Sequence, residues 1–100
     1  MELKKRRLVT VVTEASLEGR VTSDALRLGA KGFTCCEARG EGHRGARSGE
    51  WEGSRNVRIE VVCGEPVAQA LVRHLLDTYY ADYAMIVYLA DVEVIRPEKF

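Results

Sequence analysis

The stretch from residue 39 to residue 56 holds the side chains best suited to binding chemistry. It reads RGEGHRGARSGEWEGSRN and contains five of the nine glycines of the chain. Gly40 and Gly42 allow a sharp turn and a close approach of the backbone to a ligand, and successive amide groups there can cradle an anion. Arg44 and Arg47 add planar guanidinium groups that suit phosphate. Because no complete phosphate-loop pattern is present, a surface loop with solvated charges is the alternative interpretation.

Trp51 is the single tryptophan, and it lies in this polar stretch between Glu50 and Glu52. An isolated aromatic residue in such a place is either a packing anchor or a contact for a partner. Few apolar residues surround it in the sequence, so we expect a partner contact.

The balance of charged and apolar residues restricts the class of protein. The 100 residues include 15 Lys plus Arg and 15 Asp plus Glu, and 46% of them are hydrophobic. The zero net charge argues against a nucleic-acid or membrane binder that works through bulk charge. No apolar run has the roughly 20 residues of a membrane span. We therefore expect one cytoplasmic domain over residues 1–100, with no nucleic-acid partner and no membrane insertion.

The remaining nucleophilic and titratable residues indicate no catalytic or metal site. Cys35 and Cys36 are adjacent on an expected strand and so face opposite sides of it, and with Cys63 we interpret them as buried apolar residues. His43 and His74 are assigned ordinary surface or packing roles. The carboxylates form no acid–base pair that their spacing supports. The chain is therefore expected to be neither an enzyme nor a metal protein.

Hydrophobic periodicity predicts four strands and two helices. Residues 8–13, LVTVVT, are apolar on both faces, which is typical of a central strand. Residues 57–63 alternate between apolar and charged side chains, the pattern of a half-buried strand. Ser16 as N-cap and Gly29 as the residue after the last turn bound the first helix. The expected strands are 8–13, 32–39, 57–63 and 85–95, and the expected helices are 16–28 and 66–80.

The order strand, helix, strand, strand, helix, strand predicts a ferredoxin-like α+β sandwich. Both helices would then cover one face of a four-stranded sheet. The first and last strands are apolar on both faces, so the second face is left with exposed apolar side chains. A partner subunit is expected to cover that face, which predicts an oligomer.

Two other classes of protein share this fold but fit the residues less well. An RNA-binding module would need stacking aromatic residues on its central strands, and residues 57–63 contain none. A metal carrier would show Cys-x-x-Cys after its first strand, where this chain has Thr13-Glu14-Ala15-Ser16.

Three segments together resemble the PII-like signalling proteins. They are GEGHRGARSG in the long connection, NVRIEVV in the strand after it and VEVIRPE near the end. The similarity spans nearly the whole chain and is greatest to the SbtB type and the carboxysome-associated CPII type. It implies a homotrimer of ferredoxin-like subunits in which residues 39–56 form the T-loop. It also implies that adenine nucleotide, ADP or AMP, binds in clefts between subunits, together with bicarbonate.

The resemblance assigns roles to individual residues of the expected nucleotide site. Gly40 and Gly42 match the Gly-x-Gly at the base of the T-loop, and Arg44 and Arg47 match an Arg-x-x-Arg that reaches phosphate. The remaining assignments are Val62, near adenine, and Arg96, a basic position after the last strand. No residue is assigned to bicarbonate.

The implied function is signalling of inorganic carbon or energy status through the T-loop. Its partner would be a bicarbonate transporter or a carboxysome-related protein. The Gly-Asp-Gly-Lys loop of nitrogen-sensing relatives is replaced by residues 80–84, YADYA, which argues against ATP and 2-oxoglutarate sensing. The alternative is a ferredoxin-like protein-interaction or nucleotide-binding module without a carbon-sensing role.

Overall fold

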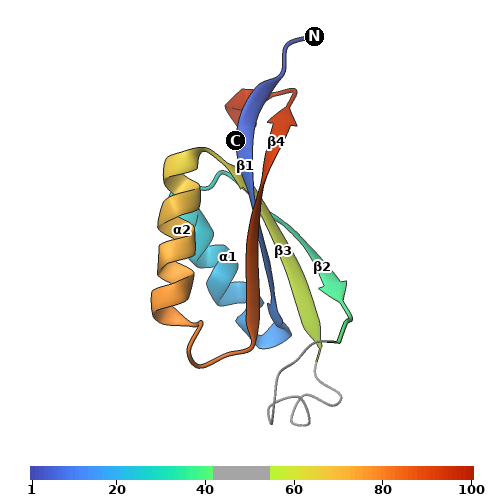
Figure 1. Ribbon diagram of the computed structural model, residues 1–100, viewed down its shortest axis with the longest axis vertical. Helices are drawn as coiled ribbons and strands as arrows, with labels where there is room; N and C mark the ends of the chain where they lie inside the picture. Colours follow the sequence, from blue (N-terminus) through green and yellow to red (C-terminus); the bar gives the residue numbers. More distant parts are fainter. Residues whose placement is uncertain (42–54) are drawn as a thin grey trace.

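Four antiparallel strands form one sheet, and two helices pack on one of its faces (Figure 1). The computed structural model describes residues 1–41 and 55–100. The order of strands across the sheet is β2-β3-β1-β4. This arrangement confirms the predicted ferredoxin-like α+β fold. The elements are β1 (Lys4–Glu14), a 3-10 turn η1 (Ala15–Leu17), α1 (Glu18–Arg27), β2 (Thr34–Ala38), β3 (Asn56–Cys63), α2 (Glu65–Thr78), β4 (Met85–Val94) and a 3-10 turn η3 (Pro97–Lys99).

Strand β1 is central, as its two apolar faces predicted. It pairs with β3 on one side and with β4 on the other. It begins at Lys4, four residues before the predicted start. The added residues are basic and carry no strand pattern of their own, but β4 is long enough to pair with them, from Lys4 opposite Val94 to Arg7 opposite Asp91.

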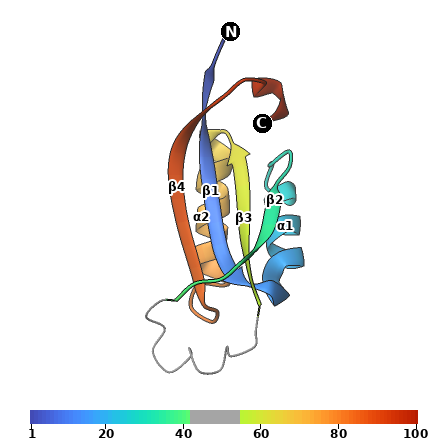
Figure 2. The same cartoon turned by 90° about the vertical axis from the view of Figure 1, so that its right-hand side faces the viewer.

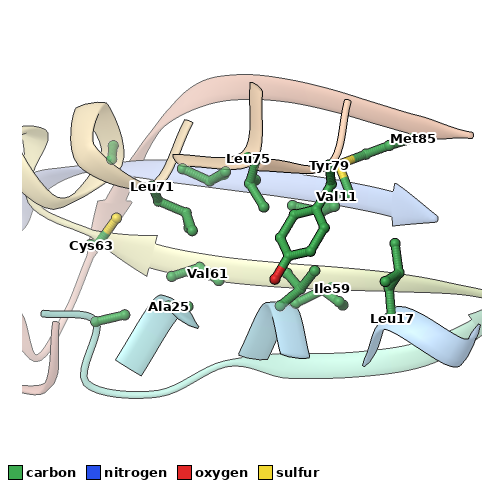
Figure 3. Packing of buried hydrophobic residues seen from close by; sticks show 14 of the residues in the cluster. Val11, Leu17, Ala25, Ile59, Val61, Cys63, Leu71, Leu75, Tyr79 and Met85 are labelled. Carbon is green, nitrogen blue, oxygen red and sulfur yellow. The ribbon is translucent and has the colours of Figure 1, made fainter. Parts of the chain in front are cut away.

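The core lies between the sheet and the two helices. Alternate residues of β1, β3 and β4 point toward the helices, since successive side chains of a strand face opposite sides. Figure 3 shows Leu71 and Leu75 of α2, and Tyr79 directly after this helix, reaching toward Ile59 and Val61 of β3. The largest fully buried apolar side chains are Val9, Val11, Leu17, Val21, Ile59, Val61, Leu71 and Leu75.

The start of α1 differs from the prediction. Ser16 does not cap the helix: it lies in η1, and its hydroxyl donates to Glu14 Oε1 at 3.2 Å. The 3-10 turn buries Leu17 and shifts the start of the α-helix to Glu18. The other end of α1 agrees with the prediction, because Gly29 follows the last turn with a φ of 117°, where a side chain would be strained.

The face of the sheet away from the helices carries the apolar side chains that the sequence predicted there. Figure 2 shows this face, with α1 and α2 behind the strands. Ile86 and Tyr88 of β4 are 42% and 49% exposed in the single chain. Across the register they lie beside Val12 and Thr10 of β1. We call this surface the open face; its apolar residues are Leu8, Val12, Val62, Ile86, Tyr88, Ala90 and Val92.

Candidate functional site

The long connection leaves the sheet between β2 and β3, and the structure fixes both of its ends. Ala38 and Asn56 form the last pair between these strands. The carbonyl of Arg55 accepts a hydrogen bond from the amide of Ala15 at 2.8 Å, which ties the returning chain to the end of β1. Arg55 also forms a 3.6 Å ion pair with Glu37, but both side chains are about three-quarters exposed and the pair is weak. The base of the connection is therefore set mainly by backbone pairing.

Only one of the residues expected at this end lies within the described part of the chain. Gly40 is exposed, and a Cβ built on it would meet no atom within 4 Å. Its φ is not in the left-handed region, which among the described residues Gly29 alone occupies. The described part of the chain thus gives no packing reason for glycine at position 40. The other residues expected at this end, Gly42, Arg44, Arg47 and Trp51, lie outside the described residues.

Val62 and Arg96 lie at the opposite end of the sheet. Val62 is half-buried on the open face, opposite Leu8. Arg96 is exposed and follows β4, whose Val94 lies opposite Lys4. The seven residues of β3 from Asn56 to Val62 cover six steps along the strand, or about 20 Å. A single subunit therefore does not bring Gly40 together with Val62 and Arg96.

A polar cluster between the helices was missed by the sequence analysis. Asp24 of α1 accepts a hydrogen bond from the Tyr79 hydroxyl at 2.5 Å and bonds His74 Nε2 of α2 at 2.8 Å. Arg20, one turn before Asp24, stacks over the rings of Tyr79 and Tyr83 at 5.2 and 5.9 Å. From the sequence we expected His74 to have an ordinary surface or packing role, and we did not predict its contact with Asp24. These contacts fix the start of the α2–β4 connection against α1.

The environment of the cluster shifts the pKa values of two of its members. Burial alone would raise the pKa of Asp24, but hydrogen bonds from Tyr79 and His74 outweigh it, so this pKa lies below its ordinary value of 3.8. Burial, together with the bond to Asp24, raises the pKa of Tyr79. Asp24 is thus ionised and Tyr79 is a neutral donor at neutral pH.

Replacing Asp24 with asparagine is expected to lower the free energy of unfolding by about 1–2 kcal/mol near pH 7, because a neutral amide is a weaker acceptor for Tyr79 and His74. A carboxylate whose pKa is depressed by folding stabilises the fold above its unfolded pKa and loses this contribution as the pH falls. The difference between the two proteins should therefore shrink as the pH drops below 3.8. Urea denaturation at several pH values measures it. The exposed Asp77→Asn on α2 is the control, and an equal loss in both variants would contradict the account.

The cysteines lie on both sides of the sheet. Cys35 shares the helix side with Ile59, whereas Cys36 lies opposite Arg58 on the open face. Cys63 is buried as expected, but Cys35 is only half-buried and Cys36 is exposed, because the edge strand β2 is poorly covered. Burial raises the pKa of the Cys35 and Cys63 thiols, so neither is an activated nucleophile.

Neither a metal-binding cluster nor a membrane-crossing helix is found within residues 1–41 and 55–100. No group of three or more His, Cys, Asp or Glu side chains there is arranged to hold a metal ion. None of the helices in these ranges combines the length and the apolar character that crossing a membrane requires.

The βαββαβ order, the helices on one face and the long β2–β3 connection define a ferredoxin-like domain. The chain belongs to the nitrogen regulatory protein P-II family, whose family model matches residues 6–99.

Solved structures support the same family assignment. A protein from Thermus thermophilus, described as a PII-like signaling protein, is 46% identical, with a TM-score of 0.85 over 100% of this chain and 99% of that one. CPII from Thiomonas intermedia, solved with ADP, AMP and acetate, is 22% identical, with a TM-score of 0.86 over 100% of this chain and 98% of that one. CPII from the same organism, solved with ADP and bicarbonate, is also 22% identical, with a TM-score of 0.85 over 99% of this chain and 97% of that one. At 22% identity the likeness establishes a shared fold.

Proposed function

We propose that this protein is a regulator that binds ADP or AMP in clefts between the subunits of a homotrimer. Together with bicarbonate, the nucleotide would report inorganic carbon or energy status by setting the conformation of the T-loop. Membership in the P-II family supports a signalling role rather than an enzymatic one. The ligands of CPII, which shares the fold, support the choice of ADP, AMP and bicarbonate.

The observation that carries the proposal is the division of the expected site between the two ends of the sheet. Gly40 lies beyond the pair formed by Ala38 and Asn56, whereas Val62 and Arg96 lie at the far end. One nucleotide meets both sets only if they come from different subunits. A cyclic assembly supplies this arrangement, because one end of each subunit then faces the other end of its neighbour.

The open face provides the interface that such an assembly needs. Ile86 and Tyr88 are nearly half exposed and continue the apolar surface of Val12 and Leu8. A contiguous apolar face of this kind is unfavourable in water and marks a contact between proteins. Three copies that meet through their open faces would bury it.

Each end of the site has its own task in this proposal. Gly40 and Gly42 let the backbone approach the nucleotide, and Arg44 and Arg47 hold its phosphates. In the neighbouring subunit, Val62 lies against the adenine ring and Arg96 adds a second positive charge. Trp51 then contacts the partner. The nucleotide changes the equilibrium between two conformations of the T-loop only to the extent that it binds one of them more tightly than the other.

The partner proposed for the T-loop is a bicarbonate transporter or a carboxysome-related protein in the cytoplasm. A ferredoxin-like interaction or nucleotide-binding module without carbon sensing is the second candidate. CPII, which shares the fold, was solved with ADP and bicarbonate, and this likeness supports the first candidate.

Calorimetric titration with ADP, AMP and ATP, each with and without bicarbonate, tests the proposed function. We expect ADP or AMP to bind, and bicarbonate to strengthen the binding. Nucleotide binding that ignores bicarbonate would support the second candidate. Absence of binding by all three nucleotides would refute a nucleotide-gated regulator.

A further inference from the structure

Two basic side chains hold the short turn that follows β4. Arg6 of β1 donates from Nη2 to the carbonyl of Pro97 at 3.2 Å. Lys31, in the connection between α1 and β2, donates from Nζ to the carbonyl of Glu98 at 3.0 Å. Figure 2 shows the chain beyond β4 crossing the end of the sheet toward β2 and α1. The two bonds thus tie the turn to two separate parts of the fold.

The turn has few other means of holding its position. It is a three-residue 3-10 turn with no buried residue. Two backbone bonds close it, from the amide of Lys99 to the carbonyl of Arg96 and from the amide of Phe100 to that of Pro97, both at 3.1 Å. Short segments with little buried apolar surface open readily. The two charged donors therefore supply much of the restraint on this turn.

The charges of these two side chains are left available, because their bonds to the turn end on neutral carbonyl oxygens. Arg7, the next residue of β1, is different: it pairs with Asp91 and with Glu65, the latter at 3.3 Å. Arg6 and Lys31 thus act on the turn itself, whereas Arg7 is held by two carboxylates.

We propose that Arg6 and Lys31 are positioning residues for Arg96, and that by fixing the carbonyls of Pro97 and Glu98 they place the Arg96 guanidinium where it meets the nucleotide phosphates. This inference rests on the proposed function. Arg96 directly precedes the turn, and its own carbonyl accepts the bond from Lys99. Fixing the turn before binding removes part of the cost of ordering Arg96 when the nucleotide arrives.

Two measurements on variants of the whole 100-residue chain test the inference. Lys31→Met should weaken ADP binding about three- to tenfold. This loss is smaller than that of a direct contact, because the hydrogen bond from Lys31 affects ADP only through the position of Arg96. The substitution should also speed amide hydrogen exchange at Lys99 and Phe100. Lys31→Arg should restore both, and Arg6→Gln should repeat the Lys31→Met result. Lys4→Met is the control: like Arg6→Gln, it removes one positive charge from the start of β1, but it should change neither ADP affinity nor amide exchange.

A double-mutant cycle with Arg96→Ala separates positioning from direct contact. If Lys31 acts through Arg96, Lys31→Met should have little further effect on ADP affinity in the Arg96→Ala background. Additive losses, or faster exchange with unchanged affinity, would overturn the inference. Wild-type protein that binds no ADP would instead refute the proposed function, and the exchange data would then report only on the turn.

Discussion

Ile86→Asp is expected to convert the proposed trimer into monomers and to abolish the proposed nucleotide binding. Ile86 lies on the open face and is 42% exposed in the single chain. The substitution therefore removes little from the core of the subunit, but it places an unpaired carboxylate inside the proposed interface. Burying such a charge costs roughly 3 kcal/mol or more at each contact, which is more than a hundredfold in association. Sedimentation velocity and ADP titration measure the two effects.

Leu76→Asp is the matched control for this experiment. Leu76 is 48% exposed, like Ile86 in size and exposure, but it lies on α2, in the helical layer. Leu76→Asp should leave the proposed nucleotide-binding trimer intact. If both variants dissociate, or if Ile86→Asp stays trimeric, the open face is not the interface.

Arg47→Ala should weaken ADP binding by about 1.5–3 kcal/mol, or roughly ten- to a hundredfold, because it removes a charge-assisted hydrogen bond to phosphate. The loss should be greater for ADP than for adenosine, which has no phosphate for Arg47 to meet. Calorimetry at fixed ionic strength measures both ligands.

Arg47→Lys and Arg27→Ala are the comparisons for this loss. Lysine keeps the charge but not the planar pair of donors, so it should recover part of the affinity. Arg27, an exposed residue near the end of α1, should be replaceable without effect on binding. An Arg47→Ala protein with wild-type affinity for ADP would remove this residue from the phosphate site.

The strands and helices were predictable where local periodicity reflects burial. Strand β3 was expected over 57–63 and spans Asn56–Cys63, because its alternating apolar residues all face the helices. Helix α2 was expected over 66–80 and spans Glu65–Thr78. Pairing with a distant strand leaves no such local signal. The basic residues Lys4–Arg6 are in β1 only because β4 extends alongside them, whereas Arg7 also pairs with Cys63 of β3.

The candidate site was less predictable than the fold, since its parts meet through long-range contacts. Asp24 and His74 are 50 residues apart, and only the packing of α1 on α2 makes them partners. The sequence signal available for this cluster was helical spacing: Arg20 lies one turn before Asp24, and Thr78 lies one turn after His74. The Gly-x-Gly at residues 40–42 was recognisable from its residue types, but the distance that separates Gly40 from Val62 follows only from the register of the sheet.

Mixed assemblies of two defective variants test the shared site most directly. Arg47→Ala alters the T-loop side of each cleft and Arg96→Ala the side supplied by the neighbour. If the variants are mixed in equal amounts, unfolded and refolded together, about a quarter of the clefts should combine an intact T-loop with an intact Arg96. This fraction should bind ADP with wild-type affinity. If no high-affinity sites return in the mixture, Arg47 and Arg96 do not meet across subunits, and the proposed intersubunit site is contradicted.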